Sequence, residues 1–505
     1  MNLRFVFPKV FRANAPREFF VRVVLLGFLA LLAQTAPAAG AEPVESVAVL
    51  QAKAEKGDTA AQCALGWRHY IGDGVPKNFG EALKWSRKAG EAGYVGAQFN
   101  LGAMFEAGVG LAQDYAEAAK WWQKAAEQGN ADAQNNIGFL FKNGKGVAQD
   151  LAKAESWYRK AADQGNANGQ YNLARILLAA KNAKEAAPLY QKAADQGNVN
   201  AQYEYGLLLL AGNGVAQNGK EAVEWLIKAG DKGNAEAQYA LGIIYREGKA
   251  VQRHTKESYR WLLMAAEQGK VEAQYECAIA NRDGIGVPAS ETETWSWYKK
   301  AGEQGHAESQ YNVALYYAKG MTVAKDLVAA LDWARRSAEQ GNAHGQQLYG
   351  TFFELGKGVP KDKIEAEKWY LKAAEQGDAQ AQSDLASLYF NGDGVAQDFA
   401  ASAKWYQKAA DQDHAEAQYS VGLLHYLGKG FAKDDKLAFD WYRKAAAQNH
   451  AVAQFSLAGL FDRGEGINKN SQEAENWYRK AIANGDLKSK AALEKLLKER
   501  AKPKE

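Results

Sequence analysis

The sequence predicts an all-α solenoid, a stack of helix-turn-helix repeats of about 36 residues each. Glutamine marks the same position of twelve consecutive repeats: Gln62, Gln98, Gln134, Gln170, Gln202, Gln238, Gln274, Gln310, Gln346, Gln382, Gln418 and Gln454. Ten of the eleven spacings are 36 residues, and the spacing from Gln170 to Gln202 is 32. Such a period is typical of repeats that cover one another's apolar faces. The 505 residues also exceed the roughly 250–300 at which a single core stops growing.

The N-terminus reads as a targeting segment. Five basic residues come first: Arg4, Lys9, Arg12, Arg17 and Arg22. An apolar stretch from Val23 to Ala33 follows, and then small residues that end at Ala41. This order predicts a secretory signal peptide over residues 1–41, cleaved near Ala41, with an uncleaved anchor as the alternative. We therefore expect a periplasmic or secreted protein, without a stable membrane span in the mature chain.

Charge and cysteine content exclude several classes of protein. Residues 1–41 hold five of the 62 Lys and Arg and one of the 59 Asp and Glu, so the remaining chain is nearly neutral. A chain of this kind has no general electrostatic attraction to nucleic acid or anionic membranes. Cys63 and Cys277 lie six repeats apart, too far for an intramolecular disulfide, and are expected to be free thiols.

The elements follow one order in each repeat, after a half-repeat at 44–57. In residues 130–165, Asn130 is placed as an N-cap, and Ala133, Ile137 and Phe141 form one apolar helical stripe. Gly138 lies in the middle of that first helix, although Gly costs about 1 kcal/mol there relative to Ala. Equivalent glycines occur in other repeats: Gly66, Gly102, Gly206, Gly242, Gly350 and Gly422. We expect two helices to approach closely at this position.

A second helix completes each repeat. Gly144 and Gly146 supply the tight reversal, and Asp150 caps a helix that runs to about Asp163. Trp157 in this helix shares a face with packing alanines, so we expect its series to be core residues. The equivalents are Trp85, Trp121, Trp225, Trp261, Trp297, Trp333, Trp369, Trp405, Trp441 and Trp477.

The fourth repeat, residues 166–197, is short and irregular. It lacks the Gly-x-Gly-Val loop, has Leu189 in place of Trp, and carries Pro188 inside its second helix. Pro in a helix interior removes a hydrogen bond and usually kinks the helix. The repeat is either tolerated drift or an irregular joint that changes the curvature of the stack. After the twelfth repeat, residues 487–505 are expected to form a capping helix and a basic tail.

These repeats resemble a known family, the Sel1-like repeat, a relative of the tetratricopeptide repeat. Ala237-Gln238, Leu241-Gly242, Tyr245 and Gly248 match its first helix, and Trp369-Tyr370 with Lys372-Ala373-Ala374 match its second. Twelve such units cover residues 58–486. The resemblance implies a right-handed α-α superhelix that acts as a scaffold or adaptor, which exported bacterial members use in envelope assembly, signalling and host interaction. The cysteine pairs of the disulfide-stapled branch are missing, so its suggested penicillin-binding or hydrolase activity is not supported.

The candidate binding residues lie opposite the packing face of the first helices. We call the side chains two and five positions after each marker glutamine the first-helix stripe. The candidates two positions after are Asn100, Asn136, Asn172 and Asn312, and those five after are Trp67, Phe139, Leu207 and Ile243. First helices line the concave surface of this superhelix type, so the stripe is expected to form a groove for an extended peptide or a partner helix. Alternatively, the apolar members pack against the next repeat and the amides are merely solvated.

No arrangement of residues predicts catalysis, a cofactor or a metal. HExxH and GxSxG motifs are missing, and the Gly-x-Gly loops do not follow strands. His306, His414 and His450 replace Asn at helix caps and lie too far apart to share one ion. We therefore predict a non-enzymatic scaffold for protein partners in the bacterial envelope. The alternative is binding of peptidoglycan or polysaccharide, or a peptidoglycan-linked enzymatic role, which would gain support if Trp67, Trp122 and Trp295 cluster in space.

Overall fold

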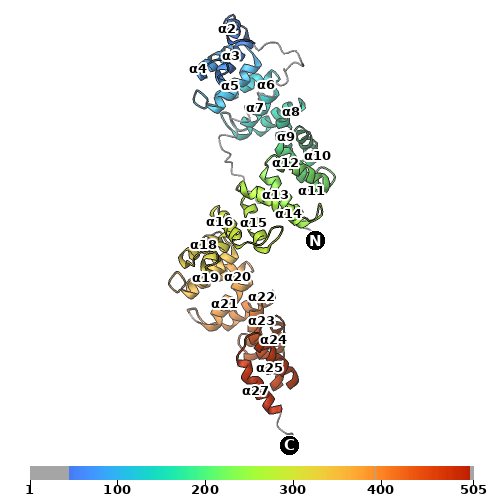
Figure 1. The fold of residues 1–505 in the computed structure, drawn as a ribbon, viewed down its shortest axis with the longest axis vertical. Helices are drawn as coiled ribbons and strands as arrows, with labels where there is room; N and C mark the ends of the chain where they lie inside the picture. The colour runs from blue at the N-terminus through green and yellow to red at the C-terminus, as the bar shows by residue number, and fades with distance from the viewer. Residues whose placement is uncertain (1–44, 393, 501–505) are drawn as a thin grey trace. The chain divides into compact units, whose positions relative to one another are not determined.

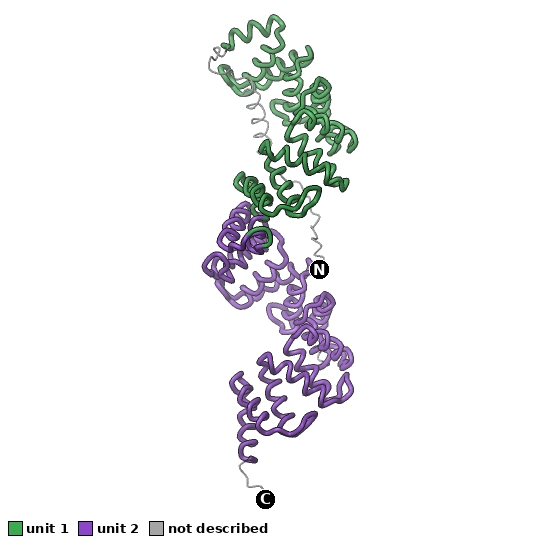
Figure 2. The backbone as a smooth tube through the Cα atoms, turned by 90° about the vertical axis from the view of Figure 1, so that its right-hand side faces the viewer, with its two compact units in different colours: residues 1–240, 249–251 green, residues 241–248, 252–505 purple. Residues whose placement is uncertain are grey.

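The computed structural model describes residues 45–392 and 394–500, which form 26 α-helices and no strand (Figure 1). The predicted signal peptide and its cleavage site lie outside the described residues. None of the helices in these two ranges is long and apolar enough to cross a bilayer. The chain divides into two compact units: unit 1 comprises residues 1–240 and 249–251, and unit 2 comprises residues 241–248 and 252–505 (Figure 2). The predicted all-α fold is confirmed.

The first helices begin where the sequence places them. Asn130 is an N-cap, because its Oδ1 accepts a hydrogen bond from the Ala133 amide at 2.7 Å, and Gly144 ends the helix with a φ of 64°. The first helices are α3 (Thr59–Ile71), α5 (Val95–Ala107), α7 (Ala131–Asn143), α9 (Ala167–Ala179), α11 (Val199–Ala211), α13 (Ala235–Glu247), α15 (Val271–Asp283), α17 (Ala307–Lys319), α19 (Ala343–Leu355), α21 (Ala379–Asn391), α23 (Ala415–Leu427) and α25 (Ala451–Arg463).

Each first helix packs against the second helix that follows it. Asp150 caps α8 as predicted, accepting from the Lys153 amide at 2.9 Å. The second helices are α4 (Phe79–Glu91), α6 (Tyr115–Glu127), α8 (Leu151–Asp163), α10 (Ala183–Asp195), α12 (Gly219–Asp231), α14 (Thr255–Glu267), α16 (Glu291–Glu303), α18 (Leu327–Glu339), α20 (Lys363–Glu375), α22 (Phe399–Ala410), α24 (Asp435–Ala447) and α26 (Ser471–Ala483). Single helices flank the repeats, α2 (Val47–Glu55) before them and α27 (Lys488–Arg500) after them.

The marker glutamines are buried and link successive repeats. Gln134 Nε2 donates to the Ala126 carbonyl at the end of the preceding second helix, at 3.0 Å. Its Oε1 accepts from Gln164 Nε2, at the end of the following second helix, at 2.7 Å. All twelve markers make the first bond. The regular spacing of glutamine in the sequence therefore reflects a hydrogen-bonding role at the junction of three helices.

The mid-helix glycines confirm the predicted close approach, but their neighbour is not the Trp series. A Cβ at Gly102 would lie 2.3 Å from Trp122 Cδ1, and one at Gly138 would lie 2.9 Å from Tyr158 Cε1. Both neighbours are the residue directly after a series Trp. That residue occupies the centre of the helix pair, since Trp122 and Tyr158 are at most 1% exposed.

The prediction that the whole Trp series is core is therefore wrong for part of it. Five members are buried: Trp85, Trp121, Trp225, Trp261 and Trp297. Six are only half-buried: Trp157, Trp333, Trp369, Trp405, Trp441 and Trp477. For most of these six tryptophans, a basic side chain three residues later lies over the ring. Lys372 Nζ, for example, is 3.7 Å from the centroid of the Trp369 ring. The Trp position lies at the edge of the core, and the ring is shielded from water by its own helix.

The fourth repeat keeps the packing of its neighbours. Helix α10 runs for 13 residues through Pro188, which is exposed. Lys181 makes the shortened turn with a φ of 63°, in place of glycine. Tyr190 is 1% exposed and lies in one apolar cluster that extends from Tyr158 to Trp225. The core of unit 1 continues through this repeat, as the interpretation of tolerated drift expects.

Candidate functional site

The structure places the predicted stripe residues on successive first helices, at intermediate depth. Every one of the eight is half-buried, so none is a core residue and none projects freely into water. In unit 1 they are Trp67 on α3, Asn100 on α5, Asn136 and Phe139 on α7, Asn172 on α9, and Leu207 on α11. In unit 2 they are Ile243 on α13 and Asn312 on α17.

Three of the asparagines take part in polar contacts that connect neighbouring first helices. Asn172 Nδ2 donates to Asn135 Oδ1 at 2.9 Å, and Asn135 Nδ2 donates to Asn136 Oδ1 at 3.2 Å, which joins α9 to α7. Asn100 Nδ2 lies 3.6 Å from Cys63 Sγ, between α5 and α3. Sequence reasoning did not foresee these inter-repeat bonds. A carboxamide has two donor hydrogens and an accepting oxygen, so these contacts use only part of its capacity.

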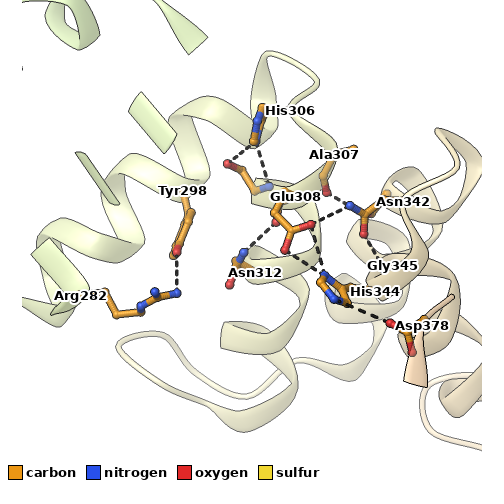
Figure 3. Close-up of polar contacts among 12 residues, drawn as sticks. Arg282, Tyr298, His306, Ala307, Glu308, Asn312, Asn342, His344, Gly345 and Asp378 are labelled. Carbon is orange, nitrogen blue, oxygen red and sulfur yellow. Dashed lines mark hydrogen bonds and ion pairs between the residues drawn. The ribbon is translucent and has the colours of Figure 1, made fainter. Parts of the chain in front are cut away.

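The fourth asparagine bonds within its own helix. Asn312 Nδ2 donates to the Glu308 carbonyl at 2.8 Å (Figure 3). Its oxygen is therefore the group oriented away from the backbone of α17, and it can accept a donor from a partner.

The apolar stripe positions are edges of the core. Phe139 packs against the cluster around Ile137 and Leu140, with Lys145 Nζ 5.4 Å from its ring centroid. Trp67 stacks on Tyr70, with ring centroids 5.2 Å apart. These side chains form shallow apolar surface rather than deep pockets.

One small cavity opens beside the stripe in unit 2. Ile279, five positions after Gln274, lines it together with the ion pair of Arg246 and Glu276. Its volume is about 20 Å³. This is room for about one water molecule and not for a substrate.

Half-buried charges also lie along the first helices. Burial raises the pKa of Glu204 and Asp384, the latter to about 6, and both stand two positions after a marker glutamine. Burial also lowers the pKa of Lys142 on α7, and the nearby Arg175 lowers it further. Partly desolvated charges of this kind are more common at functional sites than on ordinary surface.

A row of aromatic side chains directly after the marker glutamines was missed by the sequence analysis, although the same period reveals it. Its members are half-buried: Phe99, Tyr171, Tyr203, Tyr239, Tyr275, Tyr311, Tyr419 and Phe455. The row lies beside the stripe on the first helices and adds aromatic surface to it.

The predicted histidine caps are confirmed. Nδ1 accepts a helix amide hydrogen in each case, from Ser309 at 3.2 Å for His306, from Ala417 at 3.2 Å for His414, and from Ala453 at 3.0 Å for His450. A fourth cap of this type, His254, begins α14. Among the described residues, no three His, Cys, Asp or Glu side chains lie close enough together to hold a metal ion.

The tryptophans outside the core series contact different neighbours. Trp122 is 1% exposed, and its Nε1 donates to the Phe99 carbonyl at 3.1 Å. Trp295 packs on Tyr316 and Tyr317, with ring centroids 5.4 and 5.2 Å away. Trp122 and Trp295 therefore each pack against residues of their own unit.

Comparison with known protein families finds the same repeats that the helix pairs form. The sequence profile of the Sel1 repeat matches twelve consecutive segments: 59–94, 95–130, 131–166, 167–198, 199–234, 235–270, 271–306, 307–342, 343–378, 379–414, 415–450 and 451–486. The search of curated proteins finds no match.

Two solved structures illustrate the likeness. The chain is similar to c5321, a protective antigen of uropathogenic Escherichia coli with an SLR fold, at 32% identity, over 90% of this chain and 91% of that one, with a TM-score of 0.61. It is also similar to a Sel1 repeat protein from Oxalobacter formigenes, at 30% identity, over 48% of this chain and 96% of that one, with a TM-score of 0.45.

Proposed function

Because the chain belongs to the Sel1 repeat family, we propose that it is an exported scaffold that holds protein partners on the first-helix stripe. Repeat folds related to the tetratricopeptide repeat generally mediate interactions between proteins. The observation that carries the proposal is the recurrence, within each unit, of half-buried amide and apolar side chains at the same positions of the first helices. A scaffold of this kind requires no catalytic group, cofactor or metal.

The chemistry of the stripe suits an extended peptide or a partner helix. The remaining donors and acceptors of Asn100, Asn136 and Asn172 can pair with a peptide backbone. Contacts of Asn100 with Cys63, and of the other two with Asn135, orient these amides. Phe139 and Leu207 provide half-buried apolar surface for the partner's side chains. The binding energy would thus come from many shallow contacts rather than one pocket.

We also propose that the chain works outside the cytoplasm. The basic and apolar order of residues 1–41 supports export, and the similar E. coli protein is a protective antigen. Mass spectrometry of the protein recovered from the periplasm or medium tests this proposal. We expect the mature chain to begin near Glu42, and an intact Met1 in a cytoplasmic fraction would contradict export.

A photo-crosslinking experiment tests the stripe. A photoreactive amino acid is placed at Leu207 on α11 in cells that express the full chain, and at exposed Glu224 on α12 as the positional control. We expect a protein crosslink from position 207 and none from position 224. Incubation of the purified chain with peptidoglycan tests the cell-wall alternative in parallel.

A matched pair of variants separates lost binding from lost stability. The triple variant N100A/N136A/N172A should abolish the crosslink from position 207. The control N130A/N166A/N198A removes three helix caps in the same unit, which costs about 1 kcal/mol each, and leaves the stripe intact. Equal crosslinking in wild type and the stripe variant would refute the assignment of these asparagines.

A further inference from the structure

Histidine is concentrated in unit 2. The chain has seven histidines, and six of them lie in this unit. Three occupy the N-caps of first helices: His306 at α17, His414 at α23 and His450 at α25. Imidazole is the one common side chain that changes charge near neutral pH, so these caps differ in kind from Asn or Asp caps.

The hydrogen bonds fix the neutral form of these imidazoles. A capping Nδ1 must carry a lone pair, so the ring proton resides on Nε2. His450 Nε2 accordingly lies 2.8 Å from Glu416 Oε2, and His414 Nε2 lies 3.1 Å from Gln380 Oε1. A second proton could bind only at Nδ1. A proton on Nδ1 would point at the backbone N–H from which Nδ1 now accepts a hydrogen bond. It would also lie at the positive end of the helix dipole.

An aromatic ring and two carboxylates from α15 and α17 surround His306. His306 contacts the Tyr275 ring at 4.5 Å, and the carboxylates of Glu272 on α15 and Glu308 on α17 favour its protonation. Burial nevertheless outweighs both carboxylates, and the pKa of His306 is lowered.

The same balance holds at α23. Glu416 and Asp378 favour protonation of His414, while His450 opposes it, and burial is again the largest effect and lowers the pKa. His450 itself stacks on Tyr419 at 5.1 Å and faces Glu416. Glu416 in turn has a lowered pKa, chiefly because it accepts the hydrogen bond from His450.

His344 has a different position and different partners. Its Nδ1 lies 3.2 Å from Glu308 Oε1 and its Nε2 lies 3.7 Å from Asp378 Oδ2, between α17 and α21 (Figure 3). It is not a cap, because Asn342 caps α19. Helix α19 therefore keeps its cap in acid.

Among the described residues of unit 1, no first helix has a histidine N-cap. Three of its first helices, α7, α9 and α11, are capped by Asn130, Asn166 and Asn198, whose amides do not titrate. Its single histidine, His69, lies within α3.

We propose that mild acid uncaps α17 and α23 and loosens the N-terminal ends of these two first helices, while the Asn caps of unit 1 stay in place. The caps stabilise the fold fully above the unfolded imidazole pKa of about 6.5. That stability is lost as the pH falls below this value, because the unfolded chain then binds protons that the caps exclude. The response requires no bound partner.

Hydrogen exchange of the full chain, resolved by peptide mass spectrometry, tests the proposal. Measurements at about pH 7.5 and pH 5 are corrected for the intrinsic exchange rate. We expect the first turns of α17 and α23 to exchange about fivefold faster in acid, the effect of one lost cap. The first turns of α7, α9, α11 and α19, which have Asn caps, should not change.

The variant H306N/H414N provides the control, since Asn caps the same position elsewhere in the chain without titrating. Its helices α17 and α23 should lose the acid response. An unchanged acid response in the variant would overturn the proposal. The same acid loosening in unit 1 of the wild-type protein would also overturn it, because it would show a general effect of low pH.

Discussion

At the scale of single residues, the marker glutamines show why one side chain recurs unchanged. Gln134 joins the end of α6 to the end of α8 through its own amide, a task that requires a donor and an acceptor on one side chain of fixed length. Where the glutamine that donates to the marker's Oε1 is replaced by another residue, the loss of folding stability should be measurable. Gln202 Oε1 is buried without a hydrogen bond, because Lys232 replaces the usual glutamine.

The substitution Lys232→Gln should therefore stabilise the protein by about 1 kcal/mol, because it supplies the missing donor. The new amide can also replace the bond from Lys232 Nζ to the Gly197 carbonyl, as Gln128 does toward Gly93. Thermal unfolding followed by circular dichroism measures the gain. Lys220→Gln, an exposed change on the same helix, is the control, and an equal effect of both would contradict this explanation.

Asp384 should make stability depend on pH. Burial raises its folded pKa to about 6, above the unfolded value of about 3.9, so the ionised carboxylate destabilises the fold at neutral pH. The stability that protonation provides is complete below about pH 4 and lost as the pH rises through 6. Asp384→Asn should thus stabilise the protein by about 1–2 kcal/mol at pH 7.5 and by nothing at pH 4.

Melting temperatures across this pH range test the role of Asp384. Asp163→Asn, at an exposed position of α8, serves as the control. A gain from Asp384→Asn that is equally large at both ends of the range would show that burial of the charge is not the cause.

At the scale of helices, a small residue in each first helix sets how closely its partner approaches. Glycine is unfavourable there by local propensity, but it faces the largest central side chain, Trp122, in the second repeat. Alanine takes the position in other repeats, including Ala174, where the central residue is Tyr190. Both Gly138 and Ala174 therefore face a tyrosine, and of the three facing rings only that of Trp122 lies so close that glycine is required.

Gly102→Ala should destabilise the protein by about 1–3 kcal/mol, since the new methyl group would overlap the Trp122 ring. Gly138→Ala should cost less, because the facing residue is a tyrosine, as at Ala174. Thermal unfolding of both variants ranks them. Equal losses would mean that helix contact at this position does not depend on the facing ring.

At the scale of the whole molecule, a stack of repeats needs a terminal helix with a polar outer face, on which no further repeat packs. Helix α27 packs Leu493 and Leu496 against Tyr478 and Ala458. Counting from its cap Asp486, Lys490 and Glu494 take the places of the marker glutamine and the mid-helix glycine. Both are exposed, so the face on which a further second helix would pack is charged.

The double substitution L493K/L496K should release α27 and expose the apolar surface of α26. We expect concentration-dependent association in sedimentation velocity. The control E494K/L497K changes exposed positions of the same helix and should leave the protein dispersed. Association of both variants alike would show that charge, and not loss of the end cap, is responsible.

The sequence by itself determined the repeat number, the helix bounds near their caps, and the positions of the stripe, because stacking imposes one period on every packing residue. It assigned the core correctly at Ile137 and Gly138, and too broadly at Trp157. Only the tertiary structure decided which neighbour each periodic side chain meets. Trp122 rather than Trp121 fills the centre of its helix pair, and Asn172 bonds Asn135 of the preceding first helix. A period fixes the face of a helix on which a residue lies, whereas its contacts depend on how closely the next helix approaches.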